Sequence, residues 1–152
     1  MIASHSSVAR TVSGWTAPDD PFWWLTCERD ATISRRSMWM LRLVDAPGAV
    51  AARGFPAGVA VRVPLEISDK VRPANSGHWQ LTVADGKGTL IPNDRVSSSS
   101  SLTLGPRGLA ALYAGTPVGS LRLSGLASGG TPEGDAALDA AFAVTPYMVD
   151  NF

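Results

Sequence analysis

The segment from residue 59 to residue 67 alternates apolar side chains with others, and this pattern constrains the fold more than any other part of the chain. One face of an extended segment would carry Val59, Val61, Val63, Leu65 and Ile67. Because successive side chains of a strand point to opposite sides, the alternation predicts a strand with one buried face. Pro64 predicts an edge position or a bulge, since proline cannot donate a ladder hydrogen bond.

Further strand patterns lie mostly in the first two thirds of the chain. They cover residues 7–16, 32–36, 38–44, 77–83 and 101–104. The last of these is expected at a sheet edge. Residues 85–88 read Asp-Gly-Lys-Gly and predict a tight hairpin turn, because glycine adopts the positive φ angles that such a turn needs.

Helix signals are strongest in the last third of the chain. Residues 105–115 and 131–142 each begin with a proline in the first turn, and a shorter helix is expected at 45–54 with Asp45 as its cap. One more turn of helix is expected after Asp20, and residues 116–126 fit either a helix or a short strand. Because strands come early and helices late, the sequence predicts an α+β fold, a mainly antiparallel sheet with helices packed on one face.

Composition excludes several classes of function. The 13 basic residues balance the 13 acidic ones, so the chain has no electrostatic footprint for nucleic acid or for an anionic membrane. No apolar run approaches the length of a membrane-spanning helix, and residues 1–6 lack the apolar core of a signal peptide. Cys27 has no second cysteine with which to form a disulfide. A reducing, cytoplasmic compartment is therefore expected.

No motif supplies a complete catalytic or metal-binding set of residues. His5 and His78 lie far apart, and no cluster of Cys, His and carboxylate residues has metal-ligand spacing. The serine run at 97–101 lacks the Gly-x-Ser-x-Gly elbow of serine hydrolases. Dinucleotide-binding and Walker sequences are also absent. We therefore expect no metal site and no nucleotide-binding loop in this chain.

The C-terminal segment is the one unusual candidate. After Pro146 the sequence runs through apolar and aromatic residues to Phe152, whereas a solvated terminus is usually polar. If this segment packs away from water, its α-carboxylate goes with it, and a desolvated carboxylate has a raised pKa and can act as a general base. The simpler interpretation is that Phe152 only packs its ring onto the domain. The residues alone leave both interpretations open.

Three stretches of the sequence, at residues 39–54, 109–115 and 138–152, together resemble the Eis (enhanced intracellular survival) family of GNAT N-acetyltransferases. Residues 39–54 resemble the family segment W-x-L-R-L-V-D-x-P-x-A-L-A-A-R-G-Y, and residues 109–115 resemble its L-x-x-L-Y-L-G-G helix. Residues 138–142, followed by Pro146 and the terminal Phe152, resemble its L-D-x-L-F…P-W-x-x-x-x-F ending. The order and the spacing of all three agree with the family.

The resemblance implies a domain organisation. Family members have two GNAT-like domains followed by a sterol-carrier-like α+β domain. Residues 1–29 are then the incomplete tail of the second GNAT-like domain, and residues 30–152 are the sterol-carrier-like C-terminal domain. The missing GNAT domains are the expected partners, in the same chain or in another, and family members assemble as hexamers. No nucleic acid or membrane partner is expected.

The resemblance also implies a chemistry. In the family the terminal carboxylate reaches the active site of the N-terminal domain as general base, so Phe152 inherits that role. A tyrosine of that domain is the general acid, and acetyl-CoA binds there; the acceptors are amines such as aminoglycosides and lysine side chains. Asp150, Asn151 and Phe152 are the expected substrate-binding residues. The penultimate residue is often acidic in the family, and Asn151 departs from that pattern.

The chain itself lacks the GNAT pyrophosphate loop, so we expect no cofactor to bind to it, and acetyl-CoA is implied only for the full-length enzyme. Two alternatives without catalysis stay open. A stand-alone lipid-binding module would line an apolar pocket with Trp79, Leu109 and Tyr113. An oligomerisation module would use Trp23, Trp24 and Trp39 as interface anchors.

Overall fold

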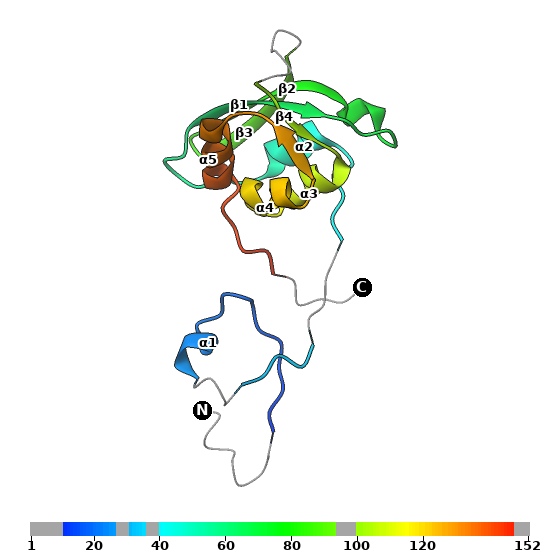
Figure 1. Cartoon of the computed structure of the whole chain (residues 1–152). Coiled ribbons are helices and arrows are strands. Elements are labelled where there is room, and N and C mark those ends of the chain that lie inside the picture. The colour runs from blue at the N-terminus through cyan, green and yellow to red at the C-terminus, as the bar shows by residue number, and fades with distance from the viewer. Residues whose placement is uncertain (1–10, 27–30, 36–39, 94–99, 148–152) are drawn as a thin grey trace. The chain divides into compact units, whose positions relative to one another are not determined.

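The computed structural model describes residues 11–26, 31–35, 40–93 and 100–147, and the chain divides into two compact units. Unit 1 comprises Met1–Ser37 and Thr145–Phe152, and unit 2 comprises Met38–Val144. Figure 1 shows the sheet and helices α2 to α5 within unit 2.

The described residues of unit 1 include one short helix, α1 (Phe22–Leu25). The helix expected after Asp20 is present, with Pro21 as its N-cap in place of Asp20, and a side-chain oxygen of Asp20 accepts a hydrogen bond from the backbone N–H of Phe22 at 2.8 Å. The strands expected at 7–16 and 32–36 are wrong for their described parts, because residues 11–16 and 31–35 have no regular structure. A strand pattern becomes a strand only where a partner takes its backbone hydrogen bonds.

Unit 2 is built on a five-stranded sheet in the order β3-β2-β1-β4-β5 (Figure 1). The strands are β1 (Val61–Ile67), β2 (Gly77–Ala84), β3 (Lys87–Pro92), β4 (Leu102–Leu104) and β5 (Ala127–Gly129). The β1–β4 pair is parallel, and the other pairs are antiparallel. The β2–β3 hairpin turns at Asp85 and Gly86, whose φ angles of 51° and 74° confirm the predicted tight turn.

One face of this sheet forms the core. Leu65 lies between Trp79 of β2 and Leu102 of β4 in the register, and all three side chains are buried. On the opposite face Arg62 and Thr89 are exposed. The alternation that predicted β1 is therefore confirmed, since it separates the two faces of the sheet.

Four helices of unit 2 lie on the buried face: α2 (Ala46–Ala52), α3 (Pro106–Tyr113), α4 (Val118–Leu123) and α5 (Pro132–Ala141). A 3-10 turn, η2 (Pro73–Asn75), precedes β2. Asp45 caps α2 by accepting from Gly48 N at 3.0 Å, and Thr131 caps α5 by accepting from Gly134 N at 3.1 Å. The predicted α+β fold, with helices on one face of a mainly antiparallel sheet, is confirmed.

Three strand expectations in unit 2 need correction. Residues 40–44 form no strand. The β4 strand lies inside the sheet between β1 and β5, not at an edge. Pro64 lies in the central strand, but β4 pairs with β1 only from Leu65 onward, so no described residue of β4 pairs with Pro64. A missing proline N–H is tolerated there for the reason that applies at a sheet edge.

Candidate functional site

The C-terminal segment begins at the end of α5, and unit 2 ends three residues later at Val144. Phe142 is the C-cap residue of that helix, and its side chain is only 4% exposed. Residues 143–147 follow without regular structure. The predicted site residues Asp150, Asn151 and Phe152 lie outside the described residues. The structure therefore describes where the tail begins, not the terminal carboxylate.

An aromatic cluster surrounds this starting point, and we call Arg53, Phe55, Tyr113 and Phe142 the tail-root cluster. The Phe142 ring lies 5.5 Å from the Phe55 ring, edge to face, and 6.3 Å from the Tyr113 ring. The Arg53 guanidinium lies 4.8 Å from the Tyr113 ring centre and 5.1 Å from that of Phe142. A guanidinium at this distance is attracted by the ring quadrupoles.

Hydrogen bonds tie the same residues to the ends of two helices. Arg53 Nη1 donates to the backbone carbonyl of Tyr113 at 2.6 Å, and the Tyr113 hydroxyl donates to the carbonyl of Ala49 at 3.1 Å. Each of the two segments therefore donates one hydrogen bond to a backbone carbonyl of the other, and these bonds join the end of α2 to the end of α3. Because the Tyr113 carbonyl lies in the last turn of α3, the Arg53 cation also meets the negative end of that helix.

Gly115 closes α3 directly beneath the tail. Its φ angle is +89°, which is favourable for glycine and strained for other residues. A Cβ at this position would lie 2.8 Å from Val144 Cγ1 and 3.0 Å from the Phe142 carbonyl oxygen. The backbone of the tail therefore passes so close to Gly115 that no side chain fits between them.

Asp139 holds the start of α4 beside the tail root. Its Oδ1 accepts a hydrogen bond from Val118 N at 2.7 Å. A small hollow of about 180 Å³ lies next to this bond. It is lined by Gly115, Thr116, Pro117, Asp139, Phe142 and Ala143.

The three stretches that resemble the Eis family meet at this place. Arg53 is the penultimate residue of the first stretch, Tyr113 and Gly115 lie in the last three residues of the second, and Phe142 closes the helical part of the third. Sequence reasoning did not single out Arg53, Gly115 or Phe142 as site residues. The signal was their position at the ends of the recognisable motifs.

Polar groups also fix the segment that enters unit 2. Arg42 donates to both carboxylate oxygens of Asp69, each at 2.8 Å. Burial alone would raise the pKa of Asp69, but hydrogen bonds from the backbone N–H groups of Arg72 and Val71, followed by the charge of Arg42, outweigh it and hold that pKa below its ordinary value. The first segment of unit 2 is therefore held through Arg42 by the buried carboxylate of Asp69, which is stabilised in its charged form.

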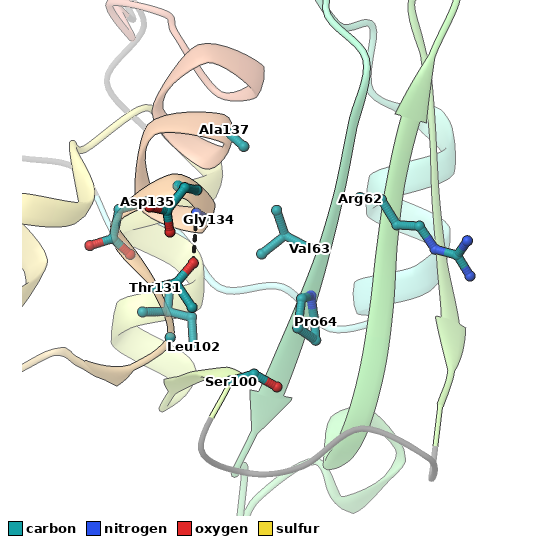
Figure 2. A pocket seen from close by; sticks show the side chains of 11 residues that line it. Arg62, Val63, Pro64, Ser100, Leu102, Thr131, Gly134, Asp135 and Ala137 are labelled. Carbon is teal, nitrogen blue, oxygen red and sulfur yellow. Dashed lines mark hydrogen bonds between the residues drawn. The ribbon is translucent and has the colours of Figure 1, made fainter.

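A larger hollow of about 260 Å³ opens between β1 and the first turn of α5. Figure 2 shows Val63 pointing into it from β1, while Arg62 points to the far side of the strand. The hollow lies beside the part of β1 that has no β4 neighbour. Of its described polar lining residues, Asp135 pairs with Arg122 and Thr131 caps α5.

The residues of the two alternatives without catalysis are also placed. Trp79 and Leu109 are buried in the core, and Trp79 Nε1 donates to the Asn75 carbonyl at 2.9 Å. Neither of them lines the two hollows described above. Trp24 is 89% exposed within unit 1, Trp23 is partly buried, and Trp39 lies outside the described residues.

The described part of the chain has neither a metal-binding group of side chains nor a membrane-spanning helix. Among those residues, no group of three His, Cys, Asp or Glu side chains is placed to hold a metal ion. No helix in the same part has the length and apolar character needed to cross a bilayer.

Comparison with known proteins gives a consistent result. Residues 46–149 match the sterol carrier protein domain family. The chain resembles a GCN5-related N-acetyltransferase from Kribbella flavida, with a TM-score of 0.88 and 49% identity over 99% of this chain and 38% of that one. A GCN5-related N-acetyltransferase from Anabaena variabilis gives a TM-score of 0.80 and 32% identity, over 90% of this chain and 34% of that one.

Eis1 from Mycobacterium abscessus is also similar, with a TM-score of 0.59 and 26% identity over 73% of this chain and 27% of that one. The chain therefore spans well under half the length of each of these three proteins. No curated protein matches it.

Proposed function

The chain belongs to the sterol carrier protein domain family, and we propose that it is the C-terminal domain of an Eis-type, acetyl-CoA-dependent N-acetyltransferase. The observation that carries the proposal is the match to the Kribbella flavida N-acetyltransferase, which extends over 99% of this chain at 49% identity. The matched protein is an N-acetyltransferase more than twice as long, so the remaining length can hold the GNAT domains. The boundary between residues 29 and 30 stays a prediction.

In this proposal the terminal carboxylate of Phe152 is the general base. An amine nucleophile is protonated near neutral pH, and it must lose a proton before its lone pair attacks the acetyl carbonyl. A carboxylate in a site that excludes water has a raised pKa, which suits it to accept that proton. The amine gains the acetyl group, the thioester bond breaks, and a tyrosine of the GNAT domain protonates the leaving thiolate.

The proposal divides the work between domains. The GNAT domains, in the same chain or in another, hold acetyl-CoA and the tyrosine acid, and this domain delivers the base. Asp150 and Asn151 stand next to that base and would contact a cationic acceptor such as an aminoglycoside or a lysine side chain. A cytoplasmic location, with access to acetyl-CoA, and assembly into hexamers complete the proposal, which involves neither nucleic acid nor membrane.

The test compares the isolated chain with a chimera. In the chimera, this chain replaces the segment of the Kribbella flavida enzyme that it matches. The acceptor is the amine that the unaltered Kribbella enzyme acetylates fastest among aminoglycosides and lysine peptides. We expect the isolated chain to show no acetyl-CoA binding by calorimetry and no transfer, and the chimera to show both. Binding and transfer by the isolated chain would place the cofactor site within these residues and contradict the proposal.

A further inference from the structure

We propose that the tail-root cluster and Gly115 together position the C-terminal tail, so that they act on catalysis through the carboxylate of Phe152. This inference rests on the proposed function, because it assigns no chemistry to these residues themselves. It assigns them the point and the direction in which the tail leaves unit 2.

The origin of the tail limits the region in which its terminal carboxylate can lie. Phe152 lies ten residues beyond Phe142, and a segment of that length reaches roughly 33–36 Å when extended. A general base acts only within hydrogen-bond reach of its proton, and a misplacement of about 1 Å can cost roughly 10²-fold in rate. An origin that shifts therefore shifts every position the carboxylate can reach.

The cluster fixes this origin from three directions. Phe55 packs against Phe142 from the segment after α2, and Tyr113 packs against it from the end of α3. Arg53 lies against both of these rings and Phe142, and its bond to the Tyr113 carbonyl holds the guanidinium in place. Side chains packed in this way have few alternative rotamers, so the exit of the tail from α5 is defined.

Arg53 is a costly residue for a purely structural role. Its partners among the described residues are aromatic rings and a carbonyl, and its Nε atom is buried without a hydrogen bond in the part of the chain that is described. An apolar side chain would fill this space without that cost. The guanidinium of Arg53 instead fixes the relative positions of the Tyr113 and Phe142 rings, because its hydrogen bond and its ring contacts are directional.

Gly115 fixes the path of the tail after Phe142. The Schellman-type turn at the end of α3 has Gly115 N bonded to the Leu112 carbonyl and Thr116 N bonded to the Ala111 carbonyl, each at 2.9 Å. The tail crosses directly over this turn at Val144. Any Cβ at position 115 must push the tail away from the domain.

The chain contains a matched control for this glycine. Gly125 closes α4 with the same turn: its N–H bonds to the Arg122 carbonyl, and Leu126 N bonds to the Leu121 carbonyl. Its φ angle is +70°, but a Cβ there meets nothing within 4 Å. Gly115→Ala and Gly125→Ala therefore share the backbone strain, and only Gly115→Ala displaces the tail.

The experiment measures kcat and KM for both variants in the chimera defined above. We expect Gly125→Ala to keep kcat within twofold, and Gly115→Ala to lower it tenfold or more with KM for acetyl-CoA unchanged. Equal kcat values for the two variants would overturn the inference. If Gly115→Ala does not fold, Arg53→Met and Arg53→Lys replace it. A loss of kcat in Arg53→Met with partial rescue in Arg53→Lys supports positioning, and wild-type kcat in Arg53→Met overturns it.

A further variant separates this inference from the proposed function. One glycine appended after Phe152 moves the carboxylate without touching the cluster. If the extended chimera keeps full activity, the proposed function fails. If it loses activity while Gly115→Ala behaves like Gly125→Ala, only the positioning role fails.

Discussion

The hydrogen bonds of Asn75 allow the cost of one substitution to be worked out from the structure. This side chain is 1% exposed. Its Oδ1 accepts from Ala46 N at 2.9 Å, and its Nδ2 donates to the Leu43 carbonyl at 3.1 Å. Asn75→Ala removes both partners and leaves a buried N–H and a buried carbonyl unpaired. Each such group costs about 1–3 kcal/mol, so we expect a loss of about 2–6 kcal/mol.

The assay is urea unfolding of the 152-residue chain, followed by far-UV circular dichroism at pH 7. Ser124→Ala is the matched control, because it removes a more exposed side-chain bond to the Ser120 carbonyl, and we expect it to cost less than about 1 kcal/mol. A loss below about 1 kcal/mol for Asn75→Ala, with an unchanged m-value, would contradict this expected cost. It would mean that water or a backbone shift satisfies the two groups that Asn75 bonds.

Three further substitutions test other parts of the account. Asp69→Asn should flatten the acid limb of the stability profile: because the pKa of Asp69 is lowered in the folded state, its stabilisation is present above about pH 4 and is lost as the pH falls through the folded pKa. Unfolding midpoints from pH 7 to pH 2.5 check this, and equal slopes for both proteins would contradict it. Phe142→Ala should cost about 3–5 kcal/mol in urea unfolding, since it empties a buried site in the tail-root cluster. A loss below about 1 kcal/mol would contradict the close packing of the Phe142 ring in that cluster. Gly108→Ala should lower the thermal midpoint of unfolding, because its Cβ would overlap the Leu126 carbonyl. The control Gly119→Ala meets nothing within 4 Å and should leave that midpoint unchanged or raise it. Similar midpoints for the two variants would contradict the close approach of α3 to Leu126.

Local signals explain how much of the fold could be predicted from sequence. The hairpin at 85–88 was predicted because its φ angles require glycine or a tolerant residue, and the caps Asp45 and Thr131 were predicted because their side chains bond N–H groups three residues ahead. Each of these features depends on residues that are neighbours in sequence.

Long-range partners explain the failures. Residues 40–44 have a strand-like pattern, but Asn75, some thirty residues later, takes the Leu43 carbonyl and holds the segment as a loop. The β5 strand consists of Ala127–Gly129, whose small residues carry no apolar alternation. Neither Asn75, as the partner of Leu43, nor β4, as the partner of β5, can be recognised from the local sequence.

The candidate site divides in the same way. The sequence indicates Phe152 as a candidate because it is one residue at a recognisable place, the end of the chain. The tail-root cluster instead joins Arg53, Tyr113 and Phe142 from segments far apart in the chain. No spacing rule links such residues, because the fold alone brings them together. The resemblance identified the three motifs, and the structure showed that their ends meet.

The most direct test of the central claim changes only the charge at the chain's last atom. The chimera is prepared by ligation with Phe152 as the free acid or as the primary amide, which has nearly the same shape and cannot accept a proton near neutral pH. Acetyl transfer is then measured from pH 6 to pH 9 at saturating acetyl-CoA. If the carboxylate is the general base, the amide lowers kcat by roughly 10²-fold or more and removes the pH dependence that the carboxylate causes. Equal kcat values and equal pH profiles for the acid and the amide would contradict it.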